Sequence, residues 1–103
     1  MYVYVWRYQV KPGSEAAFEA AYGPGGDWVR LFEGGDGYVD TLLLRDDRRP
    51  GSYLTIDRWR SQAAFEAFRA ARADAWEALD LRCEALTVIE EEIGTYAASD
   101  GAG

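Results

Sequence analysis

The sequence predicts an α+β domain of ferredoxin-like type, a βαββαβ chain with an antiparallel sheet. Segments rich in aromatic and β-branched residues, typical of strands, fall at residues 2–10, 38–45 and 52–60, with a weaker one at 92–96. Apolar residues at helical spacing follow the first and the third of these segments. The chain of 103 residues fits one domain, which we expect to span residues 1–97.

The first expected strand carries bulky side chains on both faces. Its odd positions hold Val3, Val5 and Arg7 on one face. Its even positions hold rings on the other face, namely Tyr4, Trp6 and Tyr8. We therefore expect both faces of this strand to be covered, and the Pro12-Gly13 pair to end it.

Two helices are expected between the first and second strands. Ser14 is a good N-cap for a helix over residues 15–22, and the glycine-rich run 23–26 ends that helix. A short second helix then carries Trp28 and Phe32. These rings form either a flap over a pocket mouth, with the glycines as its hinge, or a buried connector.

A charged loop joins the strands at 38–45 and 52–60 into a hairpin. One face of the second hairpin strand carries the side chains of Tyr53, Thr55, Asp57 and Trp59. Leu54 and Ile56 lie on the other face and continue the apolar side of the first strand. Left in water, that side would be an unusually large apolar surface, so we expect a homodimer that packs sheet against sheet.

The C-terminal third is expected to hold one long helix and a last strand. Ser61 caps a helix that runs to about Leu81, with a bend allowed. Residues 87–90 match a capping box and predict a short helical turn before the weak strand at 92–96. Residues 98–103 are small and polar, and are expected to form a disordered tail.

Composition excludes several classes of function. The 18 acidic and 11 basic residues give a net charge of -7, which disfavours nucleic acid and anionic membranes as partners. The absence of histidine excludes a Ser-His-Asp triad and axial haem ligation by histidine, and a single cysteine excludes a multi-cysteine zinc site. That lone cysteine, with no signal-like N-terminus and no long apolar run, predicts a cytoplasmic protein.

Three stretches resemble the antibiotic biosynthesis monooxygenase domain of the dimeric α+β barrel superfamily. They are the opening strand with residues 10–18, the strand at 53–59, and the helix start at 60–65 in a Trp-x-Ser-x-x-x-Phe pattern. The resemblance implies a dimer with a pocket between sheet and helices. It also implies a cofactor-independent monooxygenase, without metal, that acts on a flat aromatic or polyketide-like small molecule.

The resemblance is partial, because three positions differ from the family pattern. The haem-degrading branch has an Asn on the first strand and a His on the later helix, where this chain has Trp6 and approximately Arg69. Haem degradation is therefore not expected. The cofactor-free branch has an Asn where this chain has Thr55, so the match to that branch is also partial.

Asp57 is the candidate catalytic base. A carboxylate on a partly buried face has a raised pKa, and removing a proton from a phenol or an activated C–H creates a carbanion that reacts with oxygen. The alternative is that Asp57 pairs with an arginine or faces solvent. The expected substrate contacts are Trp6, Tyr22, Trp28, Tyr53, Thr55 and Trp59. For Trp59 we leave open whether it stacks on a flat ligand or packs in the core.

Two other functions stay open. The first is a non-catalytic binding module with the same pocket and no usable base. The second is a structural dimer whose rings fill every cavity, which a structure without a pocket larger than about 300 Å³ would favour.

Overall fold

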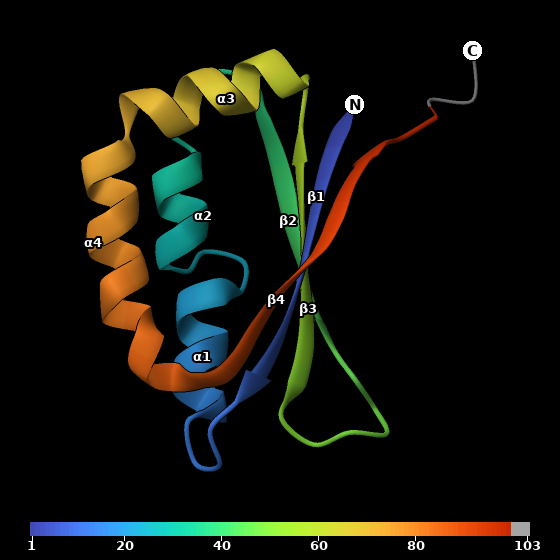
Figure 1. The fold of residues 1–103 in the computed structure, drawn as a ribbon, viewed down its shortest axis with the longest axis vertical. Coiled ribbons are helices and arrows are strands. Elements are labelled where there is room, and N and C mark those ends of the chain that lie inside the picture. The colour runs from blue at the N-terminus through green and yellow to red at the C-terminus, as the bar shows by residue number, and fades with distance from the viewer. Residues whose placement is uncertain (100–103) are drawn as a thin grey trace.

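The computed structural model describes residues 1–99 and confirms the ferredoxin-like α+β fold (Figure 1). The strands are β1 (Tyr2–Val10), β2 (Tyr38–Arg45), β3 (Ser52–Trp59) and β4 (Thr87–Ala97). The helices are α1 (Glu15–Tyr22), α2 (Asp27–Phe32), α3 (Gln62–Ala71) and α4 (Ala73–Cys83), with a 3-10 turn, η1 (Glu84–Leu86). Residues 100–103, the end of the predicted tail, lie outside the described residues.

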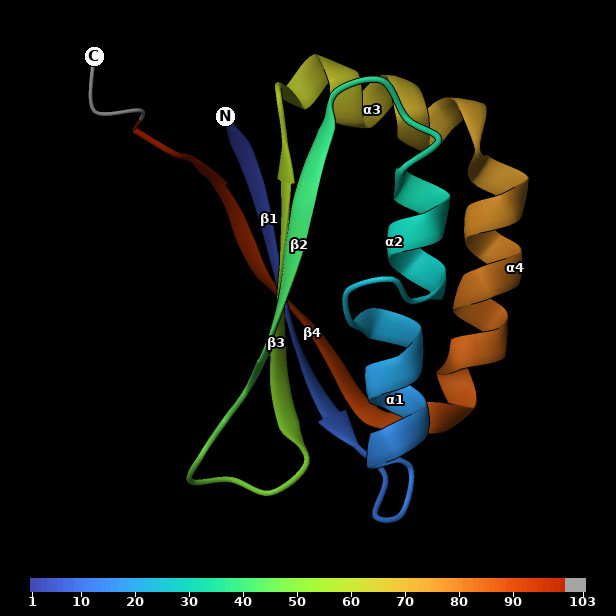
Figure 2. The ribbon, with the colours of Figure 1, turned by 180° about the vertical axis from the view of Figure 1, so that it is seen from behind.

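The four strands form one antiparallel sheet in the order β2-β3-β1-β4. Figure 1 and Figure 2 show the sheet nearly edge-on, with all the helices of residues 1–99 on one side of it and none on the other. We call these the covered face and the open face. The register pairs Tyr4 with Asp57 and Trp6 with Thr55, so the rings of β1 and the polar residues of β3 share the covered face, as the alternation predicts.

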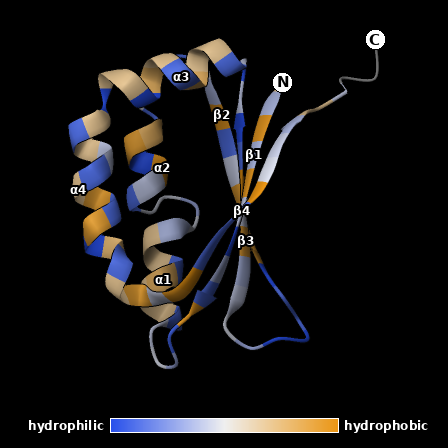
Figure 3. Cartoon of the chain, viewed as in Figure 1, coloured by the Kyte–Doolittle hydropathy of each residue, from blue (hydrophilic) through white to orange (hydrophobic). Residues whose placement is uncertain are grey.

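Aromatic rings make up most of the core between sheet and helices. Phe18 and Trp59 are fully buried, and Tyr53 is almost so. The rings of Phe18 and Tyr22 stack with centroids 4.2 Å apart. Outside this core, Figure 3 shows that the loop between β2 and β3 is hydrophilic, as expected for the predicted charged loop of the hairpin.

The long C-terminal helix is broken into two. Ser61 caps α3 as predicted, because its Oγ accepts a hydrogen bond from the Ala64 N–H at 3.1 Å. The chain turns at Arg72, which leaves the helical region with φ −115° and ψ 27°. The allowed bend is therefore a full break, and it lets α4 pack beside α2.

The predicted helical turn at residues 87–90 is wrong. Thr87 is the first residue of β4 and pairs with Val10, while Glu90 pairs with Tyr8. The turn lies earlier, in η1. The β-branched residues that follow Thr87 favour a strand. They pair with β1 despite register shifts between Gln9 and Val10 and between Val5 and Trp6, so tertiary pairing outweighs a weak capping signal.

The open face carries the apolar surface that the sequence predicts. Leu42 and Leu44 on β2 are 49% and 43% exposed, and Leu42 lies across from Ile56, which lies across from Val5. Arg58 is on the same face. It donates a hydrogen bond to Asp40 at 2.6 Å through Nε and a second through Nη2, so its partner is in the same chain.

A β-bulge interrupts the pairing of β2 with β3. Tyr38 lies opposite Trp59 and Asp40 lies opposite Arg58, which leaves Val39 as an extra residue. In a regular strand, residues at positions i and i+3 point to opposite faces. The bulge instead places Tyr38 and Thr41 together on the covered face.

Candidate functional site

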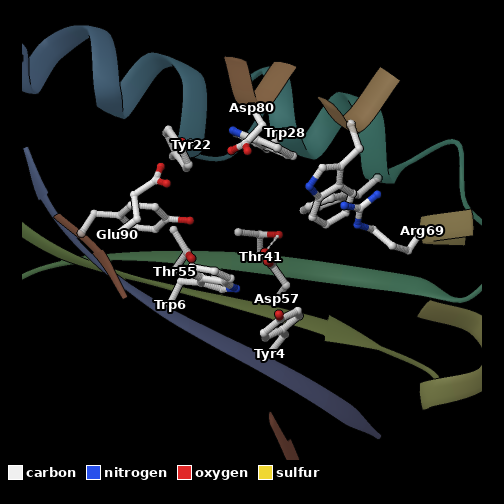
Figure 4. A pocket seen from close by; sticks show the side chains of 13 residues that line it. Tyr4, Trp6, Tyr22, Trp28, Thr41, Thr55, Asp57, Arg69, Asp80 and Glu90 are labelled. Carbon is white, nitrogen blue, oxygen red and sulfur yellow. Dashed lines mark hydrogen bonds between the residues drawn. The ribbon is translucent and has the colours of Figure 1, made fainter. Parts of the chain in front are cut away.

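A cavity of about 270 Å³ lies between the covered face of the sheet and the helices. Thirteen side chains line it, from all four strands and all four helices (Figure 4). Its floor is formed by β1 and β3, and its roof by residues of α1, α2 and α4. This is the place between sheet and helices where the family resemblance implies a pocket.

The walls of the cavity are mostly aromatic. On the floor, the rings of Trp6 and Tyr8 lie almost parallel, 6.3 Å apart at an interplanar angle of 22°. On the roof, Trp28 meets Trp76 edge to face with centroids 5.2 Å apart. Such flat apolar surfaces facing each other suit a flat ring system between them.

Asp57 places a carboxylate inside this aromatic cavity. Its side chain is half-buried, with its remaining exposed surface among the cavity-lining residues. Its Oδ1 accepts a hydrogen bond from the Thr41 hydroxyl at 2.7 Å. Burial raises the pKa of Asp57 from 3.8 to about 6, and the hydrogen bond from Thr41 opposes that rise. The carboxylate is therefore ionised at neutral pH and has the basicity of a useful proton acceptor.

Two further carboxylates and one guanidinium lie at the cavity rim. Asp80 on α4 and Glu90 on β4 are both exposed. Partial burial raises the pKa of Glu90, and the nearby charge of Asp80 adds to this. Arg69 on α3 lies over the ring of Trp76 at 4.4 Å from its centroid, a cation–π contact.

Two buried tyrosine hydroxyls complete the polar lining. Burial strongly raises the pKa of Tyr8 and of Tyr22, so both stay protonated at neutral pH. A protonated hydroxyl can donate a hydrogen bond to a negatively charged oxygen. The cavity thus combines one basic carboxylate with donors that suit an anion formed beside it.

The cavity contains most of the residues that the sequence points to. Five of the seven predicted site residues line it, namely Trp6, Tyr22, Trp28, Thr55 and Asp57. Trp28 is also buried against α4, so α2 is a packed connector. For Asp57, the alternatives of an arginine partner or a solvent-facing position do not match its hydrogen bond to Thr41 and its place in the cavity.

Tyr53 and Trp59, the other two predicted contacts, lie in the core and outside the cavity lining. Trp59 is enclosed by rings on three elements, with Tyr38 at 5.3 Å and Phe68 at 5.0 Å between centroids. The Tyr53 hydroxyl points away to Glu19 on α1, to whose carboxylate it donates at 2.5 Å. A side chain on the covered face therefore does not always reach the cavity, because only the middle of the sheet borders it.

Several lining residues escape sequence reasoning. The position of Thr41 on the covered face cannot be predicted from the pattern of β2, because the bulge breaks the alternation of that strand. The sequence pattern predicts a helical turn at Glu90, and only the pairing of Glu90 with Tyr8 places it on the covered face. Trp76 fits the apolar stripe of a helix, so its pattern resembles ordinary core packing.

Two negative findings apply to residues 1–99. No cluster of three or more Cys, Asp or Glu side chains in this part of the chain is arranged to hold a metal ion. No helix among the described residues is both long and apolar enough to span a membrane.

Comparison with known proteins places this architecture among related structures. The cofactor-independent oxygenase SnoaB from Streptomyces nogalater is 28% identical, with a TM-score of 0.74 over 96% of this chain and 93% of that one. PA3566 from Pseudomonas aeruginosa is 17% identical, with a TM-score of 0.71 over 95% and 93% of the two chains. Rv0793 from Mycobacterium tuberculosis is 16% identical, with a TM-score of 0.71 over 99% and 98%. The last two likenesses concern the fold alone.

The family assignment comes from the sequence pattern. No curated protein is significantly similar in sequence to this chain. The pattern of the family described as antibiotic biosynthesis monooxygenase, however, matches residues 1–78, which hold β1 to β3 and most of the cavity lining. The protein belongs to the antibiotic biosynthesis monooxygenase family.

Proposed function

We propose that the protein is a cofactor-independent monooxygenase that oxidises a flat aromatic or polyketide-like phenol in the cavity. The observation that carries the proposal is the Asp57 carboxylate, with a pKa near 6, between aromatic walls. The likeness to SnoaB, a cofactor-independent oxygenase, supports the same reaction class. Fold analogy alone would not name a reaction, so the proposal rests on the site.

In the proposed reaction the substrate itself supplies the electrons. Asp57 takes a proton from an activated CH₂ group, and the resulting carbanion forms a C–O bond with O₂ to give a peroxide. The second C–H bond and the O–O bond then break, and the proton held by Asp57 leaves in water. The balance is CH₂ plus O₂ to C=O plus H₂O, so no external reductant is needed. Tyr8 and Tyr22 would donate hydrogen bonds to the anion.

The cavity also limits the substrate. Its 270 Å³ lies just below the range of about 300–1,000 Å³ that is usual for ligand pockets, which favours a compact ring system over a large polyketide. Asp57, Asp80 and Glu90 outnumber the single Arg69 among the lining charges. A neutral substrate is therefore favoured over an anionic one.

The test is oxygen uptake with a panel of anthrones, naphthols and related reduced phenols. We expect wild-type protein to consume oxygen with at least one of them, and Asp57→Asn to be slower by roughly 100-fold or more, because general-base catalysis contributes about that much. Asp80→Asn is the matched control, since it removes a carboxylate from the rim of the same cavity and should keep most activity. Equal rates for Asp57→Asn and wild type would contradict the proposed role.

The cavity volume of about 270 Å³ lies below the limit of about 300 Å³, so it also favours a second candidate, a structural dimer that carries out no chemistry. Thermal shift separates the possibilities, because a ligand that binds only the folded state raises the melting temperature. A shift without oxygen uptake across the panel would favour a binding module. Neither a shift nor uptake would favour a purely structural role.

We also propose that two copies pack through their open faces to form the homodimer. The exposed leucines of β2 support this, because a lone subunit would leave them in water. A cytoplasmic location is part of the same proposal. It fits the free and buried thiol of Cys83, which suits a reducing compartment.

Leu42→Asp tests the dimer. A charge placed in a sheet-to-sheet interface loses its water, so we expect the dimer dissociation constant to rise by roughly 100-fold or more. Sedimentation velocity at micromolar concentration measures the change. Leu81→Asp is the matched control, because Leu81 is 71% exposed on α4, away from the open face, and should leave the dimer intact. A wild-type protein that sediments as a monomer would refute the proposal.

A further inference from the structure

We propose that Thr41 and Tyr38 are positioning residues for Asp57. A hydrogen-bond chain from Tyr38 through Thr41 holds carboxylate atom Oδ1, and so leaves Oδ2 to take the proton of the substrate. The catalytic part of this inference rests on the proposed function. The hydrogen-bond chain exists in the folded protein alone, so its effect on the titration of Asp57 can be measured without any substrate.

Counting protons gives the chain a direction. The Thr41 hydroxyl has one proton, and it donates that proton to Asp57 Oδ1 at 2.7 Å. The Tyr38 hydroxyl lies 2.7 Å from the Thr41 oxygen. Since the Thr41 proton is already used, Tyr38 is the donor in that second bond. Tyr38 thereby strengthens Thr41 as a donor to the carboxylate.

The hydrogen-bond chain runs from the edge strand β2 to its neighbour β3. Thr41 on β2 lies directly opposite Asp57 on β3 in the register, so its short side chain reaches the carboxylate across one strand spacing. Tyr38 reaches Thr41 only because of the bulge at Val39, which turns both onto the covered face. The bulge and the hydrogen bonds thus fix the direction in which Asp57 points.

No other group holds Asp57 in this way. The other titratable or charged side chains that line its cavity come from β1, α1, α3, α4 and β4, namely Tyr4, Tyr8, Tyr22, Arg69, Asp80 and Glu90. Within residues 1–99, Thr41 is the one side chain that hydrogen-bonds to Asp57. Burial raises the pKa of Asp57, and the Thr41 hydrogen bond is the effect that lowers it. Thr41 therefore sets the direction of the carboxylate and limits the rise in its pKa that burial causes.

Thr41→Val is the test, because valine has the shape of threonine without the hydroxyl and suits a strand. The Asp57 carboxyl carbon is titrated by ¹³C NMR, with Asp57→Asn used to assign its signal. We expect roughly ten-fold tighter proton binding at Asp57 in Thr41→Val, because the ionised carboxylate then loses the hydrogen bond that stabilises it. Thr41→Ser keeps the hydroxyl and should titrate like wild type.

Tyr38→Phe is the second variant, and it keeps the inference testable if Thr41→Val does not fold. It removes only the outer hydroxyl, so we expect a smaller change in the same direction. An unchanged titration of Asp57 in Thr41→Val, or in Tyr38→Phe if that is the variant that folds, would overturn the inference.

The kinetic readout separates this inference from the proposed function. With an active substrate, Thr41→Val should move the acidic limb of the kcat/KM profile to higher pH, while Thr41→Ser should not. A shifted profile with nearly normal kcat on its alkaline side would support positioning. A wild-type protein inactive on every substrate would refute the proposed function, whereas the NMR titration would still decide whether the chain controls Asp57.

Discussion

Replacing Trp59 by alanine is expected to lower the free energy of unfolding by about 3–5 kcal/mol, the usual cost of emptying a buried aromatic site. Trp59 is 0% exposed and is surrounded by rings of α2, β2 and α3. No polar group could fill the space that its removal leaves. Urea denaturation at a fixed protein concentration measures the loss, because any dimer makes apparent stability depend on concentration.

Trp59→Phe is the matched control for this prediction. The indole Nε1 of Trp59 is buried without a hydrogen-bond partner among residues 1–99. Replacement by phenylalanine therefore removes a polar group whose burial costs free energy. The loss for Trp59→Phe should therefore be much smaller than for Trp59→Ala. A loss below about 1 kcal/mol for Trp59→Ala would contradict the core position and would revive a role as a pocket wall.

Asp57→Asn is expected to stabilise the folded protein at pH 7 by about 2–3 kcal/mol. The pKa of Asp57 is about 6 in the folded protein against 3.8 for the free side chain. Between pH 4 and 6, roughly, the folded state therefore binds a proton that the unfolded state has lost. The stability of wild type falls as pH rises through this window, and asparagine does not carry that cost.

Chemical denaturation of both proteins at several pH values checks the sign. The advantage of Asp57→Asn should be nearly full above about pH 6 and should vanish below about pH 3, where aspartate is neutral in both states. A wild type as stable as the variant at pH 7 would contradict the raised pKa. Together with the expected loss of oxygen uptake, a gain in stability would indicate that Asp57 is kept for function at the expense of the fold.

The sequence predicts well which side chains of β1 and β3 lie on the covered face, because side chains alternate strictly between the two faces there. Trp6, Thr55 and Asp57 reach the cavity as the period of a strand requires. The same reasoning cannot tell that Tyr53 and Trp59, at the ends of β3, are closed off by α1 and α3. Which part of a face stays open depends on how helices distant in sequence pack over it.

Thr41 and Glu90 show a second limit. Both depend on how strands pair, and pairing is a long-range property that local patterns do not contain. A bulge adds one residue and shifts every side chain before it, so the face of Tyr38 cannot be read from its neighbours alone. The capping-box pattern at Thr87 is a local signal that a neighbouring strand overrides.

The bulge at Val39 also determines which changes of chain length β2 tolerates. Loss of one residue from a strand normally reverses the facing of all residues on one side of the cut. Loss of Val39 would instead straighten β2 and leave Tyr38 and Thr41 on the same side, since the deleted residue is the surplus one. Loss of a residue between Thr41 and Arg45 has no such compensation. We therefore expect a variant that lacks Val39 to keep Tyr38 and Thr41 on the same side as Asp57.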